Sequence, residues 1–378
     1  AGAWCGQNKY LSAIKNAFQN FMPLTIAGAI GVLWCNVLVN DQTGLGLFFK
    51  PIMALDFLNP AFQAVNFCTI SCITVGITLG IAQEIGVWNM GAERAGYIPG
   101  LVGLAAWLSV TNTSHMVEGA KEAFTGIAGN ELGATGLFTG MIIGVLSVEL
   151  FCFFEKQDAL KIKMPEQVPP GVARAFEVLV PATITLIITA CIGSACYNLT
   201  GLYLNDVIKN GIQGPLGAVG ATIPGVMIIY LVIMLFWLVG IHGNNMLSAV
   251  KEALFTPLAL ENVEKFNKGE KPTNIINMYA LQMWGEFGGS GVTIGLVIAI
   301  MIFGKREDNK AIATLSLVPG LFNINETVTF GIPMVLNPIL GIPFVFACLV
   351  TILVGYVLTV IGFCPVACLT VPWTTPPI

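Results

Sequence analysis

Residues 323–333 read NINETVTFGIP and lie inside one of the most apolar parts of the chain. ATLSLVPGLF precedes them and MVLNPILGIPFVFACLVTILVGYVL follows them. Glu326 stands here with two asparagines and two threonines, and a carboxylate at membrane depth costs at least about 2.5–3.5 kcal/mol on insertion scales. The stretch therefore predicts a membrane protein whose apolar segments are interrupted by a polar group with a function.

The composition supports a membrane protein. The chain has 378 residues, of which 55% are hydrophobic and 10% are charged, whereas soluble domains carry about 25% charged residues. The formal net charge of −4 predicts no nucleic-acid partner. The chain has only two histidines, and most of its ten cysteines lie in apolar runs, where free cysteine behaves as a small hydrophobe. We therefore expect neither a metal nor a cofactor.

Apolar stretches mark the membrane spans, since a helix needs about 17–25 residues to cross a bilayer. The clearest stretches are 20–39, 64–81, 98–110, 137–154, 179–196, 223–241, 288–303 and 342–371. We expect an all-α polytopic protein with about ten transmembrane helices, the last of which can extend past residue 378.

Two regions, 242–260 and 311–338, are partly polar and rich in Gly, Asn and Pro. Each follows an apolar helix and leads to another. Non-helical backbone at membrane depth is tolerated only where it is buried in protein or lines a wet cavity. We interpret both regions as re-entrant hairpins.

A basic, proline-containing linker divides the chain into two domains. The predicted boundaries are 1–155 for an amino-terminal helical domain, 156–178 for the linker with an amphipathic segment, and 179–378 for a transport domain. The linker is the best cytoplasmic loop by the positive-inside rule. Three predicted spans separate it from the basic loop 304–310, so either one span is miscounted or one loop is not cytoplasmic. Glu93 and Arg94 are interpreted as an interfacial structural pair.

The first polar region begins with WLVGIHGNNMLS, residues 237–248. His242 ends an apolar helix, a glycine follows, and Asn244 and Asn245 supply both hydrogen-bond donors and acceptors. One interpretation is a helix-ending turn with an interfacial histidine. The other is a binding site, because polar groups at membrane depth are usually functional.

The second polar region is the opening stretch. In an extended chain, Asn323 and Asn325 would share one side with the two threonines, and Glu326 would face the opposite side. A turn at NINE would instead gather them. The alternative to a functional Glu326 is a structural ion pair with a basic residue.

Two further segments add aromatic and polar groups. In VPWTTPPI, residues 371–378, Trp373 beside hydroxyl groups suits the apolar face of a sugar ring, or else belongs to the aromatic belt at the headgroups. In YALQMWGEFGGSG, residues 279–291, the candidates are Trp284, Glu286 and Ser290. Its glycine cluster is weak as a phosphate-loop signal, and helix packing explains it equally well.

The carboxy-terminal half thus holds neutral hydrogen-bonding groups, tryptophans, one histidine and one carboxylate. An anionic substrate would require Arg or Lys there. This set favours a neutral, hydroxyl-rich and partly flat ligand, which describes a sugar.

Several motifs resemble those of the IIC permease component of the bacterial sugar phosphotransferase system, in its lactose/cellobiose/diacetylchitobiose branch. They are GIHGNN, LVPGLFNINETVTFGIPMVLNPI, VPWTTPPI and, in the central loop, MPEQVPPGVARAF. The resemblance covers nearly the whole chain and implies a location in the bacterial inner (cytoplasmic) membrane. It implies a homodimer in which the amino-terminal domain is the dimerisation scaffold and the carboxy-terminal domain carries a disaccharide.

The resemblance also implies residue roles. Glu326 would be the essential glutamate near the sugar 6-hydroxyl, His242 the active-site histidine, and Trp237 and Trp373 ring contacts. The phosphoryl donor would be a phosphocysteine on a separate IIB protein, with a IIA protein upstream. A rival interpretation is a proton-coupled secondary sugar transporter, because broken helices and a membrane glutamate suit it too; a purely structural scaffold is less compatible with the polar clusters.

Overall fold

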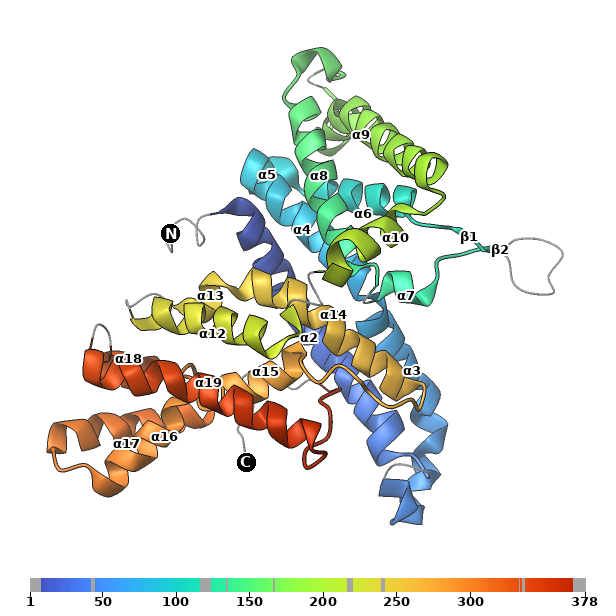
Figure 1. The fold of residues 1–378 in the computed structure, drawn as a ribbon. Coiled ribbons are helices and arrows are strands. Elements are labelled where there is room, and N and C mark those ends of the chain that lie inside the picture. Colours follow the sequence, from blue (N-terminus) through green and yellow to red (C-terminus); the bar gives the residue numbers. More distant parts are fainter. Residues whose placement is uncertain are drawn as a thin grey trace. The chain divides into compact units, whose positions relative to one another are not determined.

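The computed structural model describes residues 8–41, 45–115, 124–133, 135–165, 167–215, 220–238, 242–332, 334 and 337–369. Helices make up nearly all of its regular structure (Figure 1). The strands β1 (Ser114–His115) and β2 (Phe124–Thr125) form one antiparallel pair. The predicted all-α class is confirmed.

The helices before residue 216 are α2 (Lys9–Leu33), α3 (Asn59–Cys68), α4 (Ile73–Met90), α5 (Ala92–Ala95), α6 (Ile98–Val110), α7 (Gly129–Leu132), α8 (Leu137–Glu155), α9 (Pro170–Thr200) and α10 (Leu204–Ile208). The later helices are α12 (Ile223–Leu238), α13 (Gly243–Met246), α14 (Ser248–Asn267), α15 (Met278–Gly285), α16 (Thr293–Phe303), α17 (Glu307–Leu321), α18 (Glu326–Gly331) and α19 (Pro338–Val360). Short 3₁₀ or π segments occur at Trp34–Leu38, Leu45–Leu47, Lys50–Leu58, Ile70–Cys72, Asp158–Leu160 and Lys209–Gln213.

Long apolar helices suit a membrane protein. Within the described residues, the helical segments with the length and composition to cross a bilayer are Lys9–Leu38, Lys50–Met90, Leu137–Glu155, Pro170–Thr200 and Ile339–Val360. Shorter apolar helices are Ile98–Val110, Ile223–Leu238 and Thr293–Phe303. The polar regions do contain helix breaks, at 247 between α13 and α14 and at 322–325 between α17 and α18. The count of about ten spans and the re-entrant course of these breaks stay predictions.

The chain divides into two compact units. Unit 1 contains Ala29–Gln63 and Leu216–Ile378, and unit 2 contains Asn8–Gly28 and Ala64–Pro215. The division differs from the sequence-based boundaries, because helix α9 runs through the predicted linker end at residue 178 and packs against α6 and α8 of unit 2. The scaffold and transport roles of the two parts stay predictions.

Unit 2 is built on α4, α6, α8 and α9, which pack against one another. Ile77, Ile81 and Ile85 recur every four residues along α4 and are completely buried. This spacing places them on one helix face, as expected for a helix that packs between neighbours. Trp107 of α6 is buried in the same way.

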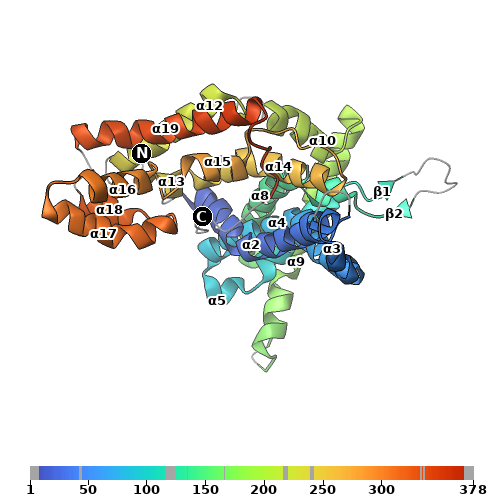
Figure 2. The ribbon, with the colours of Figure 1, turned by 90° about the horizontal axis from the view of Figure 1, so that it is seen from below.

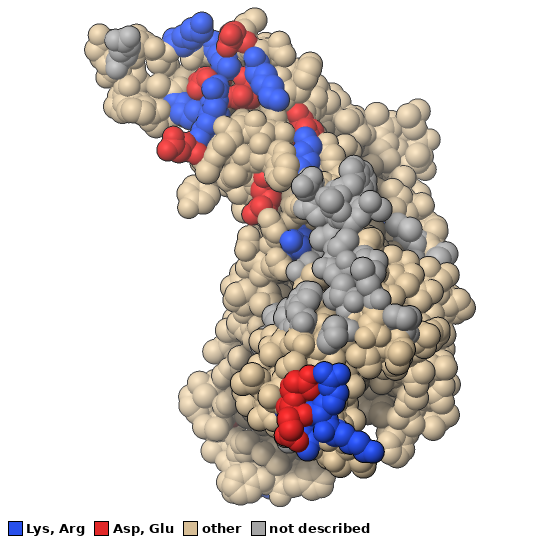
Figure 3. All heavy atoms as spheres, turned by 90° about the vertical axis from the view of Figure 1, so that its left-hand side faces the viewer, with Lys and Arg blue, Asp and Glu red and all other residues tan. Residues whose placement is uncertain are grey.

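Charged side chains are few and grouped. On the face shown in Figure 3 they gather in small groups, and neutral atoms cover most of the rest. In unit 2, the buried Glu155 carboxylate is 2.8 Å from Arg94 and 3.0 Å from Arg174. Arg94 also contacts Glu177 at 3.0 Å, so its described ion-pair partners lie on α8 and α9 and do not include its neighbour in sequence.

The linker carries its own ion pair. The exposed Asp158 carboxylate accepts a hydrogen bond from Lys161 Nζ at 3.1 Å, and this contact lowers the pKa of Asp158. The carboxylate therefore stays charged to a lower pH than an ordinary aspartate would.

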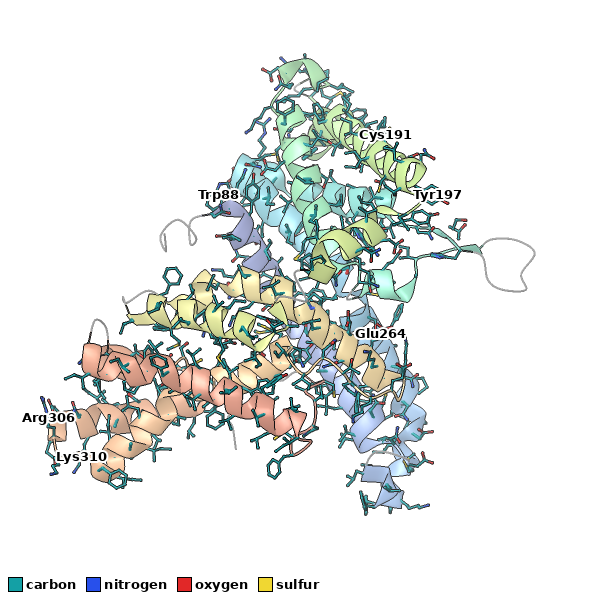
Figure 4. The ribbon with its side chains drawn as sticks, in the orientation of Figure 1. Trp88, Cys191, Tyr197, Glu264, Arg306 and Lys310 are labelled. Carbon is teal, nitrogen blue, oxygen red and sulfur yellow. The ribbon has the colours of Figure 1, made fainter. Side chains whose placement is uncertain are left out.

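Unit 1 is a second helical body. Helix α19 packs against α12 and α15, α14 packs against α15, and α16 packs against α17 (Figures 1 and 2). Arg306 directly precedes α17 and Lys310 lies in its first turn (Figure 4). The buried core of unit 1 includes Tyr230 and Trp237 from α12 and Cys348 from α19. The helices of this unit position the candidate site.

Candidate functional site

Hydrogen bonds join four separate segments inside unit 1. Lys251 Nζ of α14 donates to Asn244 Oδ1 of α13 at 3.3 Å, and Asn244 Nδ2 donates to Ser290 Oγ at 2.7 Å. The Ser290 carbonyl in turn accepts from Asn325 Nδ2 at 2.9 Å. We call the residues Asn244, Lys251, Glu286, Ser290 and Asn325 the polar cluster. Four of them were predicted from the sequence, and the structure brings them together.

The NINE stretch forms a turn. Asn323 has a φ of 62°, in the left-handed region that asparagine tolerates better than most residues. Its Oδ1 accepts from the Gly288 amide at 2.8 Å. Asn325 is buried and also donates to Thr329 Oγ1 at 3.1 Å. Of the two sequence-based alternatives, the turn is therefore the observed one, and it directs both asparagines onto residues 288–290.

The glycine-rich segment fits against this turn. Gly289 has a φ of 91°, and a Cβ atom there would lie 2.5 Å from Asn325 Cβ. Thr293 Oγ1 donates to the Gly288 carbonyl at 2.9 Å and ties the segment to the start of α16. The glycines thus allow two chain segments to approach closely, as in the packing interpretation of GGSG.

Glu286 and Lys251 form an ion pair. The Lys251 side chain is 5% exposed and that of Glu286 is 19% exposed. The Tyr230 hydroxyl donates to Glu286 Oε1 at 3.3 Å, and Lys251 Nζ lies 5.7 Å from the Tyr230 ring centroid. A structural ion pair with a basic residue is the alternative role that the sequence leaves open for Glu326. The structure shows such a pair at Glu286.

Sequence reasoning missed Lys251. It lies in MLSAVKEALF, seven residues after Asn244. In a continuous helix, positions seven apart fall on one face; here α13 and α14 are separated only at residue 247. A lysine with that spacing from a candidate ligand-binding asparagine is the signal that could have found it.

His242 and Trp237 are neighbours. Their ring centroids are 4.3 Å apart, with an interplanar angle of 46°. Trp237 is 1% exposed and His242 is partly buried. The next residue, Gly243, lies too close to α12 for a side chain, because a Cβ atom there would lie 2.0 Å from the Ile233 carbonyl oxygen.

The remaining predicted residues are placed as follows. The Trp284 indole packs on Gly355 of α19, where a Cβ atom would lie 2.4 Å from Trp284 Cδ1. Glu326 is the first residue of α18. The side chains of Asn245 and Glu326, and the whole of Trp373, lie outside the described residues.

Buried asparagines hold the segment that leads to Trp373. Asn262 and Asn277 are completely buried, and their Nδ2 atoms donate to the Ala367 carbonyl at 3.0 and 3.1 Å. Asn277 Oδ1 also accepts from the first amides of α15. The chain six residues before Trp373 is thereby fixed to α14 and α15.

The polar cluster combines the uncharged hydrogen-bonding groups of Asn244, Ser290 and Asn325 with the Lys251–Glu286 ion pair, in which each charge neutralises the other. Across the described parts of the chain, no group of three or more His, Cys, Asp or Glu side chains could hold a metal ion. Amide and hydroxyl groups arranged in this way can bind a hydroxylated, uncharged ligand.

Comparisons with known proteins identify the family. The family model "Phosphotransferase system, EIIC" matches residues 15–348. The chain is 33% identical over 374 residues to the oligo-beta-mannoside-specific EIIC component of Bacillus subtilis (strain 168), covering 98% of this chain and 82% of that protein. It is 29% identical over 432 residues to the cellobiose-specific EIIC component of Lactococcus lactis subsp. lactis (strain IL1403), covering 99% and 87%.

A solved structure agrees with the sequence matches. The crystal structure of the transporter ChbC, the IIC component of the N,N'-diacetylchitobiose-specific phosphotransferase system, has a TM-score of 0.89 and 29% identity, covering 99% of this chain and 86% of that one. This chain therefore belongs to the phosphotransferase-system EIIC family.

Proposed function

We propose that this protein is the membrane permease component of a phosphoenolpyruvate-dependent sugar phosphotransferase system, and that it binds and translocates a β-linked disaccharide. Cellobiose, N,N'-diacetylchitobiose and lactose are the candidate substrates. The names of its relatives support this class, because oligo-β-mannosides, cellobiose and diacetylchitobiose are all β-linked.

The convergence of Asn244, Ser290 and Asn325 carries the proposal. The Asn244 carboxamide donates to the Ser290 hydroxyl and the Asn325 carboxamide donates to the Ser290 carbonyl, so three segments of unit 1 meet at Ser290. Asn325 is buried and directly precedes Glu326, so the bonded asparagine holds the backbone from which the carboxylate projects. Neutral hydrogen-bonding groups beside the chain position of Glu326 match the needs of a sugar whose primary hydroxyl is to react.

The chemistry assigned to Glu326 is general-base assistance. Its carboxylate accepts the proton of the sugar 6-hydroxyl as that oxygen attacks the phosphorus of a phosphocysteine on a separate IIB protein. The new P–O bond forms, the S–P bond breaks, and the cysteine leaves as a thiolate. Positioning supplies much of the catalysis in phosphoryl transfer. His242 is the proposed second active-site residue.

The aromatic residues would hold the sugar rings. Trp373 would pack on the apolar face of a pyranose, and the contacts of Asn262 and Asn277 with Ala367 support a fixed position for the segment that leads to it. Trp237, Trp284 and Asn245 are further candidates. The proposed assembly is a homodimer in the inner membrane, served by a phosphorylated IIB protein with a IIA protein upstream.

A disaccharide that lacks the 6-hydroxyl tests the proposal. Membrane vesicles containing the protein are given the natural sugar and its 6-deoxy analogue, with and without the phosphoryl-donor proteins and with and without an ionophore. We expect phosphorylation and accumulation of the natural sugar only with the donor proteins. The analogue should bind more weakly, because a buried carboxylate loses its partner, and should not be phosphorylated.

The ionophore arm separates this function from a proton-coupled carrier. Accumulation of unmodified sugar that stops with ionophore and ignores the donor proteins would overturn the proposal. A thermal-shift screen of β-linked disaccharides on the purified protein identifies which sugar to use.

A further inference from the structure

The Lys251–Glu286 ion pair lies where a sugar permease has no evident need for charge. Both residues belong to the polar cluster, yet a disaccharide is neutral. Each group has a protein partner: Glu286 accepts from Lys251 and from the Tyr230 hydroxyl, and Lys251 donates to Glu286 and Asn244.

The pair determines which way the Asn244 carboxamide faces. A lysine ammonium only donates hydrogen bonds, so the atom 3.3 Å from Lys251 Nζ must be the carbonyl oxygen of Asn244. The amide nitrogen then points toward Ser290 Oγ, 2.7 Å away, which has to accept. If the carboxamide were rotated by half a turn, its NH₂ group would face the ammonium, which is unfavourable.

The same argument fixes the role of Ser290. Its hydroxyl oxygen accepts from Asn244, and its proton is left to be donated. Among the described residues no acceptor takes that proton, and Ser290 is itself 5% exposed. The bonds therefore run in one direction, from Lys251 to Asn244 to Ser290, and end in a donor.

We propose that Lys251 and Glu286 are positioning residues for sugar binding: Glu286 holds Lys251, Lys251 orients Asn244, and the Ser290 hydroxyl donates to an oxygen of the disaccharide. This rests on the proposed function. It also changes the role expected of Glu286, which acts through Lys251 and does not contact the sugar.

Two observations favour positioning over direct contact for Glu286. Its carboxylate oxygen Oε1 already accepts from both Lys251 and Tyr230. Its partner Lys251 is the more deeply buried of the pair, so moving the carboxylate toward a ligand would leave an ammonium uncompensated in the interior. A sugar hydroxyl is uncharged and cannot neutralise the Lys251 ammonium in place of the carboxylate.

A double-mutant cycle on the purified full chain tests the assignment. Binding of cellobiose and of N,N'-diacetylchitobiose is measured by calorimetry for wild type, K251M, E286Q and K251M/E286Q. We expect K251M to weaken binding about tenfold, because a charge-assisted hydrogen bond that holds Asn244 is lost. E286Q should weaken binding in the wild-type background and have less than about a twofold effect in the K251M background. An equal loss from E286Q in both backgrounds would mean that Glu286 contacts the sugar, and would overturn the assignment.

A second cycle excludes a general structural role. In an S290A background, K251M should cost less than about a further twofold in affinity, because the route to the sugar is already cut. A lysine needed only for folding would lower the affinity by the same factor in both backgrounds. The matched control is K268M, which removes an exposed lysine of the same helix region that pairs with Glu264 at 2.7 Å (Glu264 is labelled in Figure 4) and should leave binding unchanged.

Asn244→Asp keeps the assignment testable if K251M does not fold. It keeps an oxygen facing Lys251 and replaces the amide donor to Ser290 with a carboxylate oxygen, which accepts the Ser290 proton and so takes it away from the sugar. Binding should fall about tenfold, and wild-type affinity would overturn the assignment. If wild type binds neither sugar, the proposed function fails together with this inference; if wild type binds and the cycles show no coupling, only the inference fails.

Discussion

Glu326 is the residue on which the proposed chemistry depends. It follows the buried Asn325 and opens α18, so its backbone is held by contacts with residues 288–290. A glutamine at this position keeps the size and hydrogen-bonding capacity of the side chain but loses its charge and its basicity. The substitution therefore separates carboxylate chemistry from packing.

We expect Glu326→Gln to preserve folding and to weaken sugar binding by about 1.5–3 kcal/mol, the usual worth of a hydrogen bond to a charged group. Phosphorylation should fall more steeply, because the base is also lost. Calorimetry and phosphoryl-transfer assays on the same preparation measure the two effects. The matched control is Glu307→Gln, at an exposed carboxylate 3.5 Å from Lys310, which should change neither. A near-normal phosphorylation rate in Glu326→Gln would remove this residue from the reacting hydroxyl.

Among the elements, the glycine segment before α16 and the turn before α18 depend on each other. The segment approaches Asn325 closely at Gly289, where φ is positive and no space exists for a Cβ atom. A side chain here would strain the backbone and push Asn325 away from the Ser290 carbonyl. The contact between these two segments therefore also holds Asn325, a residue of the polar cluster, in place.

Gly289→Ala should destabilise the protein by about 1–3 kcal/mol, the usual cost of holding a residue in a sparsely populated conformation. It should weaken sugar binding as well. Gly295→Ala is the control: this glycine lies inside α16 with nothing within 4 Å of an added Cβ atom, so alanine should be neutral or stabilise by up to about 1 kcal/mol. Unfolding in detergent and sugar titrations compare the two variants. Equal stability of both variants would contradict the close contact at Gly289.

For the whole molecule, the proposed homodimer requires one of the two units to form the contact between copies. The stretch GLVGLAA in α6 has small residues that permit close helix packing, and unit 2 lacks the polar cluster found in unit 1. We therefore expect the dimer to form through unit 2, so that unit 1 stays free to carry the sugar.

Site-specific photo-crosslinking tests this division of labour. A photoreactive residue is placed at exposed apolar positions of unit 2, such as Leu101, Leu146 and Ile187, and for comparison at Ile302, Leu315 and Val350 of unit 1. Covalent dimers should form mainly from the unit 2 positions. Adducts arising chiefly from unit 1 would contradict the expected scaffold.

The sequence by itself determined the class of protein and the location of its polar breaks. Low charge and long apolar runs are local properties, since lipid selects each segment separately for its hydropathy. For the same reason the polar residues near 242–245, 286–290 and 323–326 were recognisable as candidates. The motifs they form also identified the family, which the comparisons confirmed.

The tertiary structure alone decided which of these residues meet. Asn244 and Ser290 are 46 residues apart in the chain, and Ser290 and Asn325 are 35 apart, yet each pair is hydrogen-bonded. No local pattern reports such distances. The Lys251–Glu286 pair went unpredicted for the same reason: the two residues are 35 apart in the chain, and nothing in α14 alone shows that the carboxylate following α15 lies beside Lys251. Packing also decides that α9 belongs to unit 2. The proline-containing linker predicts a domain boundary at residue 178, but α9 runs from Pro170 to Thr200 without a break there.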